Sequence, residues 1–411
     1  MWVGGIGVPM NRRSFLKTAV FAVAMSRKAG SRGLVLLRHP DSIVISEIEW
    51  FVYKPGLRDP SIETDLRCAT RITAKPGIHG WADTAGWAAP NAETAGDLRG
   101  RLLGRRINLP GDLWRELYES GLPLGVLGAI DIALWDLWGR LENKPVHALL
   151  GTQRQTVKTY ATTDVPLGDP SQYARYARSC KEVGLHGCKI RPHLAPSPTA
   201  QAPPGEGFPD RDMAVYEAVR EAVGPDFACM ADNGGTYTFD QALRVGKFLD
   251  SLRYDWYESP MPETEAWRER YIALTSHIKT PICTTKNLAD SYLARAAWLA
   301  SKACDIGQID VHCGGFTPCL EMAHACESLD VSLELHDVGP DAYPHLQLIA
   351  ATGESLIPYA QVPSVSRSPC ILPGRTTPEP ALDAHGCIPI PQTPGMGLEL
   401  DWQYIFTHRV F

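Results

Sequence analysis

The second half of the chain repeats one pattern: a short apolar, strand-like run that ends on an acidic, basic or imidazole side chain. The runs are HGCKIR, FACMAD, RYDWYE, PICTTK, IGQID and VSLELH. The polar residues that close them are Lys189 with Arg191, Asp232, Glu258, Lys286, Asp310 and His336. A stretch long enough for a helix follows each run, which predicts a parallel sheet of strand–helix units. If the sheet closes into a (β/α)₈ barrel, all strand ends lie at one face and these side chains converge on one cavity.

The first part of the chain follows a different pattern. Residues 42–52, 68–74 and 80–83 read as strands separated by turns, and the strongest helical stripe runs from Gly128 to Leu141. This indicates an α+β unit with an antiparallel sheet. We therefore predict a tail over residues 1–40, the N-terminal part of an α+β capping domain over 41–155, a catalytic barrel over 156–360, and a C-terminal segment over 361–411 that packs on the capping domain.

Composition narrows the class of protein. The 411 residues are 44% hydrophobic and 21% charged, as in globular proteins, and the net charge of −6 argues against a nucleic-acid partner. Outside the N-terminus no apolar run is long enough to span a bilayer, so we expect no membrane partner. The eleven cysteines form no CxxC pair, and most stand in apolar runs. We interpret them as buried small side chains rather than disulfides or metal ligands.

The N-terminus resembles a twin-arginine export signal. Residues 11–17 read NRRSFLK, an apolar run over residues 19–25 follows, and Ala22-Val23-Ala24 could be a cleavage site. Export would place the protein in the periplasm. The apolar run is short and basic residues follow it closely, so the alternative is an unstructured basic tail on a cytoplasmic protein.

A long Pro- and Gly-rich connection follows Arg191 and ends near Asp212. Loops of this length at a strand end are either functional covers or disordered segments. The connection contains His193, and His312 follows another strand end. We interpret both histidines as polar residues that line the cavity rather than as catalysts.

The stretch from Ala129 to Arg140 (AIDIALWDLWGR), with KPVHALLG over residues 144–151, resembles a signature of the enolase superfamily, and more narrowly of its mandelate racemase/muconate lactonizing branch. The resemblance extends over roughly residues 41–400. It implies a modified (β/α)₇β barrel of the TIM type with an α+β capping domain, and a homo-oligomer. It also implies Mg²⁺ held by three carboxylates at successive strand ends, and abstraction of the proton α to a carboxylate.

The resemblance assigns Asp232 and Glu258 as the first two metal ligands, but the third position is Lys286. A protonated lysine cannot ligate Mg²⁺ and would repel the ion. Either Asn287 or water completes the shell, or the ammonium takes over part of the metal's charge-neutralising role. A third alternative is that Lys286 points elsewhere and forms an ion pair with Glu258.

For the base, the resemblance offers the second lysine of a Lys-x-Lys pair or a His–Asp dyad. The pair here reads Lys189-Ile190-Arg191, and arginine stays protonated, so Arg191 is a poor base but a good clamp for a carboxylate. The dyad is present as His336 and Asp310. A carboxylate on one imidazole nitrogen raises the basicity of the other, so we predict His336 as the base. Gln361 matches the position that binds the substrate carboxylate.

With a single base, the resemblance implies the one-base reaction most common in this branch, dehydration of an acid sugar (an aldonate or aldarate) by a lyase. His336 would be its base, and Lys189, Arg191 and Lys286 would supply positive charge. Substrate selection would come from cap loops at residues 54–63 and 84–91, with Arg58, Trp81 and Trp87 as candidates. Both tryptophans could equally belong to the core of the cap. The alternatives are an epimerase or sugar-lactone cycloisomerase on the same scaffold, or a non-catalytic protein that binds a sugar acid.

Overall fold

The computed structural model describes residues 43–56, 66–74, 77–163, 166–192, 208–288, 292–336, 342–362 and 371–410. The predicted export signal, Arg58, His193 and most of the connection after Arg191 lie outside the described residues. Within them, no helix is both long and apolar enough to cross a membrane. The ten described cysteines are all free, and eight of them are buried.

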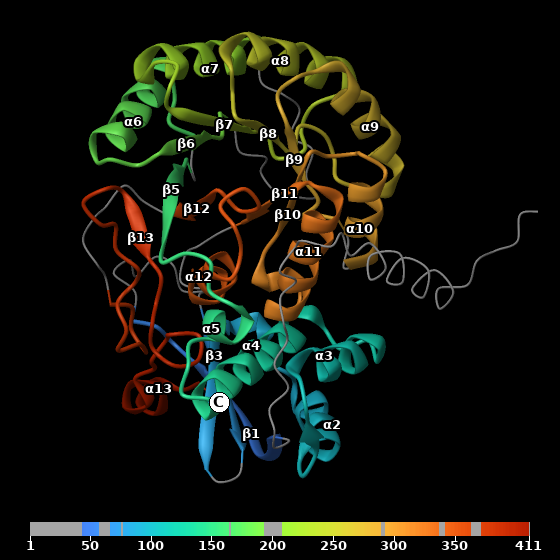
Figure 1. The fold of residues 1–411 in the computed structure, drawn as a ribbon, viewed down its shortest axis with the longest axis vertical. Coiled ribbons are helices and arrows are strands. Elements are labelled where there is room, and N and C mark those ends of the chain that lie inside the picture. Colours follow the sequence, from blue (N-terminus) through green and yellow to red (C-terminus); the bar gives the residue numbers. More distant parts are fainter. Residues whose placement is uncertain are drawn as a thin grey trace, which may run out of the picture.

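A four-stranded antiparallel sheet and a set of helices form the cap (blue and teal in Figure 1). The strand order is β3-β2-β1-β4. The strands are β1 (Ile43–Tyr53), β2 (Arg67–Ala74), β3 (Ile78–Ala85) and β4 (Arg106–Ile107). The helices are α2 (Ala92–Leu102), α3 (Pro110–Glu119), α4 (Leu124–Leu141) and α5 (Val146–Leu150), with a short 3₁₀ turn η1 (Gly86–Ala88). The α+β unit predicted for this part of the chain is thus present.

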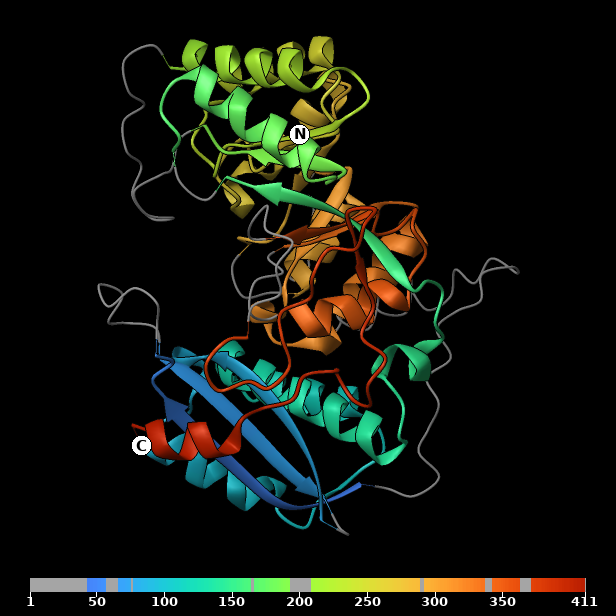
Figure 2. The same ribbon diagram turned by 90° about the vertical axis from the view of Figure 1, so that its left-hand side faces the viewer.

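Helix α4 is buried over most of its length because it packs between the cap sheet and the barrel (Figure 2). Gly80 of β3 allows this contact, since a Cβ there would collide with the α4 backbone at Leu137. The carboxylate of Asp131 accepts hydrogen bonds from the backbone N–H and hydroxyl of Thr317, at 2.7 and 2.6 Å. One buried helix therefore joins the cap to the barrel through both apolar and polar contacts.

Eight parallel strands form a nearly closed barrel, hydrogen-bonded in the order β11-β10-β9-β8-β7-β6-β5-β12. They are β5 (Thr156–Thr162), β6 (Gly187–Ile190), β7 (Ala228–Asp232), β8 (Trp256–Glu258), β9 (Ile282–Thr284), β10 (Ile306–Ile309), β11 (Ser332–Leu335) and β12 (Tyr359–Val362). The connecting helices are α6 (Pro170–Glu182), α7 (Asp210–Val223), α8 (Phe239–Leu252), α9 (Arg268–His277), α10 (Tyr292–Ala300), α11 (Phe316–Leu329) and α12 (Ala342–Ala350). Short 3₁₀ turns occur at η2 (Glu265–Trp267) and η3 (Val311–Cys313). The predicted (β/α)₇β architecture is confirmed.

The C-terminal segment contacts both parts of the molecule (red in Figures 1 and 2). Helix α13 (Trp402–His408) lies on the cap sheet, where Ile405 joins a buried cluster with Tyr53 and Leu398. Upstream, the short strand β13 (Cys387–Pro389) pairs antiparallel with β5. Packing on the cap was predicted from the sequence, whereas the strand added to the barrel sheet was not.

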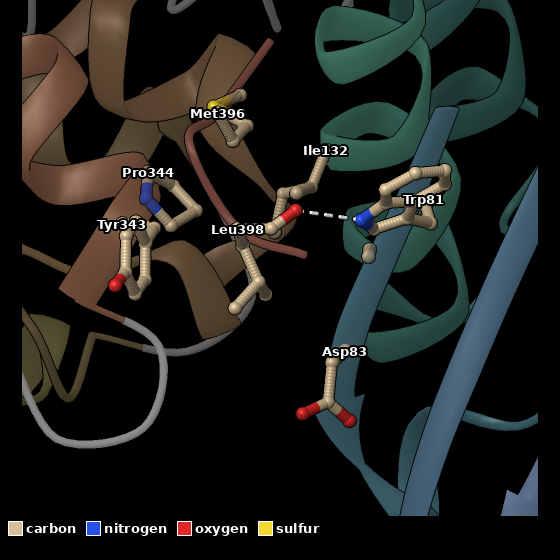
Figure 3. Close-up of a pocket in the computed structure, with 8 residues that line it drawn as sticks. Trp81, Asp83, Ile132, Tyr343, Pro344, Met396 and Leu398 are labelled. Carbon is tan, nitrogen blue, oxygen red and sulfur yellow. Dashed lines mark hydrogen bonds between the residues drawn. The ribbon is translucent and has the colours of Figure 1, made fainter. Parts of the chain in front are cut away.

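A cavity at the junction of cap, barrel and C-terminal segment is lined by Trp81, Ile132, Tyr343 and Leu398, among others (Figure 3). The indole N–H of Trp81 donates to the Leu398 carbonyl at 2.8 Å. Close by, the buried carboxylate of Asp83 accepts hydrogen bonds from Tyr53, Arg67 and Arg375. These contacts hold the C-terminal segment against the cap.

Candidate active site

The strand ends of the barrel bring the predicted polar residues to one mouth. Each residue stands at the C-terminal end of its strand or just beyond it. Because parallel barrel strands all end at the same face, the side chains lie at one mouth. Lys189 belongs to β6, Asp232 to β7 and Glu258 to β8, while Arg191, Lys286, Asp310 and His336 follow β6, β9, β10 and β11.

Lys189 and Glu258 form a buried ion pair. The ammonium donates to Oε2 of Glu258 at 2.8 Å, and the side chains are only 1% and 3% exposed. Burial alone would raise the pKa of Glu258, but the nearby charges of Lys189 and His336, together with hydrogen bonds from Gln308 and Lys189, lower the pKa to about 2. Glu258 is therefore ionised, and its charge is already balanced. Lys189 was predicted to supply positive charge to the reaction, and in the structure its ammonium is buried and bonded to Glu258.

Arg191 and Asp232 form a second pair nearer to solvent. Two guanidinium nitrogens of Arg191 donate to Oδ2 of Asp232, at 2.9 and 2.6 Å. The other carboxylate oxygen accepts from the backbone N–H of Gly234 at 3.0 Å. The Arg191 side chain is 31% exposed while that of Asp232 is 1% exposed. Arg191 thus neutralises Asp232 while part of its side chain remains exposed to solvent at the mouth.

His336 lies between Asp310 and Lys286. Its Nε2 is 2.9 Å from the Lys286 ammonium, and its Nδ1 is 3.5 Å from Oδ2 of Asp310, longer than an ideal hydrogen bond. Because an ammonium can only donate, Nε2 accepts and a neutral imidazole carries its proton on Nδ1, facing Asp310. Burial would raise the pKa of Asp310, yet His312 and His336 hold it well below its usual value. The arrangement leaves the basic lone pair of His336 at the mouth.

The turn that carries Lys286 is fixed from several sides. Thr285 has φ of 107°, a conformation that a β-branched residue rarely adopts, and its hydroxyl donates to the Gln308 carbonyl at 2.8 Å. Glu263 accepts the backbone N–H groups of Thr285 and Asn287, at 3.1 and 2.9 Å. Arg295 donates to the Lys286 carbonyl at 2.8 Å. A strained backbone held in this way sets the direction of the Lys286 side chain.

A buried polar network beneath the mouth was missed in the sequence. The Tyr160 hydroxyl lies 2.5 Å from Oε1 of Glu334 and 3.0 Å from Oε1 of Gln361. Burial raises the pKa of Glu334, and the nearby charge of Glu258 adds to the effect. Glu334 stands two residues before His336, so the period of two along a strand could have indicated that it faces the barrel interior. Gln361 was predicted at the mouth but is buried in this network.

The two cap tryptophans have different surroundings. Trp81 is packed in the cap, where the Arg140 guanidinium stacks on its ring at 3.6 Å and Trp402 packs edge-on. Trp87 is 64% exposed, and its ring lies 5.9 Å from that of His312, directly after β10. The backbone N–H of His312 donates to Asp310 at 2.8 Å. Of the two candidates, Trp87 is the one placed beside the barrel mouth.

The donor set does not fit Mg²⁺. This ion requires hard oxygen ligands, and of the three positions that the resemblance assigned as ligands only Asp232 and Glu258 carry carboxylates, both already paired with cations. The third position holds the Lys286 ammonium, which cannot ligate. Asn287, the predicted substitute, is exposed and its amide nitrogen donates to Glu263 at 3.3 Å. The predicted ion pair between Lys286 and Glu258 is replaced by the contact between Lys286 and His336.

An α+β cap over a (β/α)₇β barrel, with acid–base side chains at the strand ends, defines the class of the enolase-type barrel enzymes. The chain matches the enolase C-terminal domain-like family over residues 172–404. It also matches the mandelate racemase/muconate lactonizing enzyme N-terminal domain over residues 61–151. It therefore belongs to the mandelate racemase/muconate lactonizing branch of the enolase superfamily, as the sequence motifs predicted.

Several characterised enzymes are similar to this chain. The D-galactarolactone cycloisomerase of Agrobacterium fabrum is 28% identical over 347 residues, which cover 80% of this chain and 88% of the relative. The arabinonate dehydratase of Saccharolobus solfataricus is 24% identical over 361 residues, covering 80% and 87%. The D-glucarate dehydratase of Agrobacterium tumefaciens, solved in complex with magnesium, superposes with a TM-score of 0.78 at 25% identity and covers 90% of this chain and 99% of that one.

Proposed function

We propose that the protein is a hydro-lyase that dehydrates an aldonate or aldarate, with His336 as the base. The observation that carries this proposal is the position of His336, with Asp310 at Nδ1 and the Nε2 lone pair turned to the mouth beside Lys286. The names of the relatives support a sugar acid as the substrate class. In this role Lys286 moves from Nε2 to the substrate carboxylate, and the movement frees the base.

The reaction follows from the charges at the mouth. His336 removes the proton α to the carboxylate, and the electrons of that C–H bond move into the carboxylate to give an enediolate. Arg191 and Lys286 stabilise its added negative charge. The electrons then return to form a double bond between C2 and C3, and the C3 hydroxyl leaves as water with the proton from the imidazolium. The resulting enol tautomerises to a 2-keto-3-deoxy acid.

One base rather than two disfavours racemisation, because Arg191 stands where a second base would be needed. Cycloisomerisation of a sugar lactone needs only one base. The similarity to D-galactarolactone cycloisomerase makes it the second candidate. The two reactions share removal of the α-proton and differ in the leaving group, which is hydroxide in one and the ring carboxylate oxygen in the other.

The test is incubation with a panel of sugar mono-acids, di-acids and lactones in D₂O, followed by NMR. We expect α-deuterium incorporation or a dehydrated product with one panel member, lowered by roughly 10² to 10⁴-fold in His336→Asn. The matched control is His277→Asn at the exposed end of α9, which should keep the wild-type rate. Exchange that persists unchanged in His336→Asn would refute the assignment of the base. Absence of exchange across the whole panel would refute the proposed substrate class.

A further inference from the structure

The net charge of the three assigned ligand positions differs when a lysine replaces a carboxylate at the third position. Three carboxylates around a divalent cation carry one net negative charge. Two carboxylates beside one ammonium carry the same net charge. At the three assigned ligand positions the two carboxylates are those of Asp232 and Glu258, and the ammonium is that of Lys286, whose nearest partners in the structure are His336 and Asp310. The replacement of a carboxylate by Lys286 therefore conserves the charge of the group only if no divalent cation is added.

The backbone around Lys286 is fixed by several contacts from other parts of the chain. The turn before it contains the strained Thr285, and Glu263 and the buried Arg295 hold the backbone on both sides. The side chain is 26% exposed, and its ammonium contacts His336 at 2.9 Å and Asp310 at 3.9 Å. A surface lysine that merely tolerates substitution would not have its backbone fixed by so many contacts.

The two carboxylates at the assigned ligand positions already have cationic partners within the chain. Glu258 is bonded to Lys189, and Asp232 is bonded to Arg191 through two nitrogens. A divalent cation bound there would compete with both ion pairs, at a site that contains three positive side chains. Removal of the partner of a buried charge is costly, so this exchange is unfavourable.

We propose that the site neither binds nor needs a divalent cation, because the Lys286 ammonium occupies the place of the metal. Together with Arg191 it supplies the positive charge that faces a bound carboxylate. The binding half of this proposal is independent of the reaction. The catalytic half rests on the proposed function.

The test uses Mn²⁺ as a paramagnetic probe for an oxygen-ligand site, with free Mn²⁺ measured by EPR, and thermal unfolding with and without Mg²⁺. The proteins are the wild type, Lys286→Glu, which restores three carboxylates, and Lys247→Glu, the same charge change on an exposed position of α8. We expect Lys286→Glu to bind one Mn²⁺ per chain at least about tenfold more tightly than the wild type and Lys247→Glu. Only Lys286→Glu should show a higher Tm in Mg²⁺.

Stoichiometric Mn²⁺ binding by the wild type that is lost in Asp232→Asn would overturn the proposal. Failure of a folded Lys286→Glu variant to gain Mn²⁺ binding would overturn the assignment of Lys286 to the metal's place. If a substrate is found, turnover should be unchanged after exhaustive chelation, and a rate that falls more than about tenfold and returns with Mg²⁺ would refute the catalytic half. Because the EPR assay needs no substrate, failure of the proposed function would leave the binding result intact.

Discussion

Asp131 is a carboxyl group buried in the middle of α4, where the cap meets the barrel. Burial raises its pKa from 3.8 to about 7, although two hydrogen bonds from Thr317 oppose the shift. Between these two values the folded chain holds a proton that the unfolded chain has released. Its stabilising contribution is therefore fully present below about pH 4 and is lost as the pH rises through about 7.

The Asp131→Asn variant keeps an oxygen acceptor for Thr317 but cannot titrate. We expect the stability of the wild type relative to this variant to fall by up to about 4 kcal/mol between pH 4 and pH 7. Urea unfolding at a series of pH values measures the difference. Asp112→Asn, on an exposed position of α3, is the control and should show no such trend. A difference that stays flat or rises over this range would contradict the prediction.

The residues at the strand ends could be predicted from the sequence, but their partners could not. Each apolar run located one polar side chain, or two in the run that carries Lys189 and Arg191, and the shared direction of the strands placed all of them at one mouth. Which charges meet depends on side-chain reach. Lys189 extends from β6 past β7 to Glu258 on β8, while Arg191 stops at Asp232 on the neighbouring strand. Spacing along a chain carries no information about such choices.

At the scale of elements, the turn after β9 depends on Glu263, which lies in the preceding connection. Its removal in Glu263→Ala leaves the buried N–H of Thr285 and that of Asn287 without this acceptor. We expect a loss of about 1 to 3 kcal/mol in unfolding free energy, because an unsatisfied buried donor costs about that much. Glu269→Ala, on an exposed position of α9, should change stability by less than about 0.5 kcal/mol. Equal stability losses in the two variants would argue against a role for Glu263 in holding the turn.

The long periodic elements were predicted more successfully than the short ones. Helix α4 and strands β1 and β2 agree with the sequence pattern to within a few residues, because a sustained apolar period defines them. Strand β13 has three residues, one of them Pro389, and its pairing with β5 is a tertiary contact across more than two hundred residues. The turn at Thr285 was also beyond prediction, since the hydrogen bonds that impose its positive φ come from distant segments.

At the scale of the whole molecule, Asp83 joins the cap to the C-terminal segment. Arg375 contacts it at 2.7 Å, and both side chains are about 98% buried or more. In Asp83→Asn the charge that faces Arg375 and Arg67 disappears. We expect a loss of about 3 to 5 kcal/mol, measured by urea unfolding, because a buried positive charge loses its counter-ion. Asp97→Asn removes the exposed pair with Arg101 and should cost less than about 1 kcal/mol.

A double variant tests whether the stability loss in Asp83→Asn comes from the unpaired charge of Arg375 or from altered packing. Asp83→Asn combined with Arg375→Met removes both charges, and it should be more stable than Asp83→Asn alone. Limited proteolysis adds a local readout, since a weakened clamp should expose the C-terminal segment to cleavage earlier than in the wild type. If the double variant is no more stable than the single one, the loss arises from packing rather than from the unpaired charge.

The contact between β1 and the segment around α13 also determines when the protein can fold during synthesis. The backbone N–H of Val410 donates to the Val52 carbonyl at 2.7 Å, and Ile405 packs against Tyr53. This face of the first strand of the cap is therefore covered only after the segment around α13 has been synthesised and has left the ribosome. Until then the cluster formed by Phe51, Tyr53 and Trp81 lacks its partners from this segment. We therefore expect the cap to complete its packing late, after a long non-local segment has returned to it.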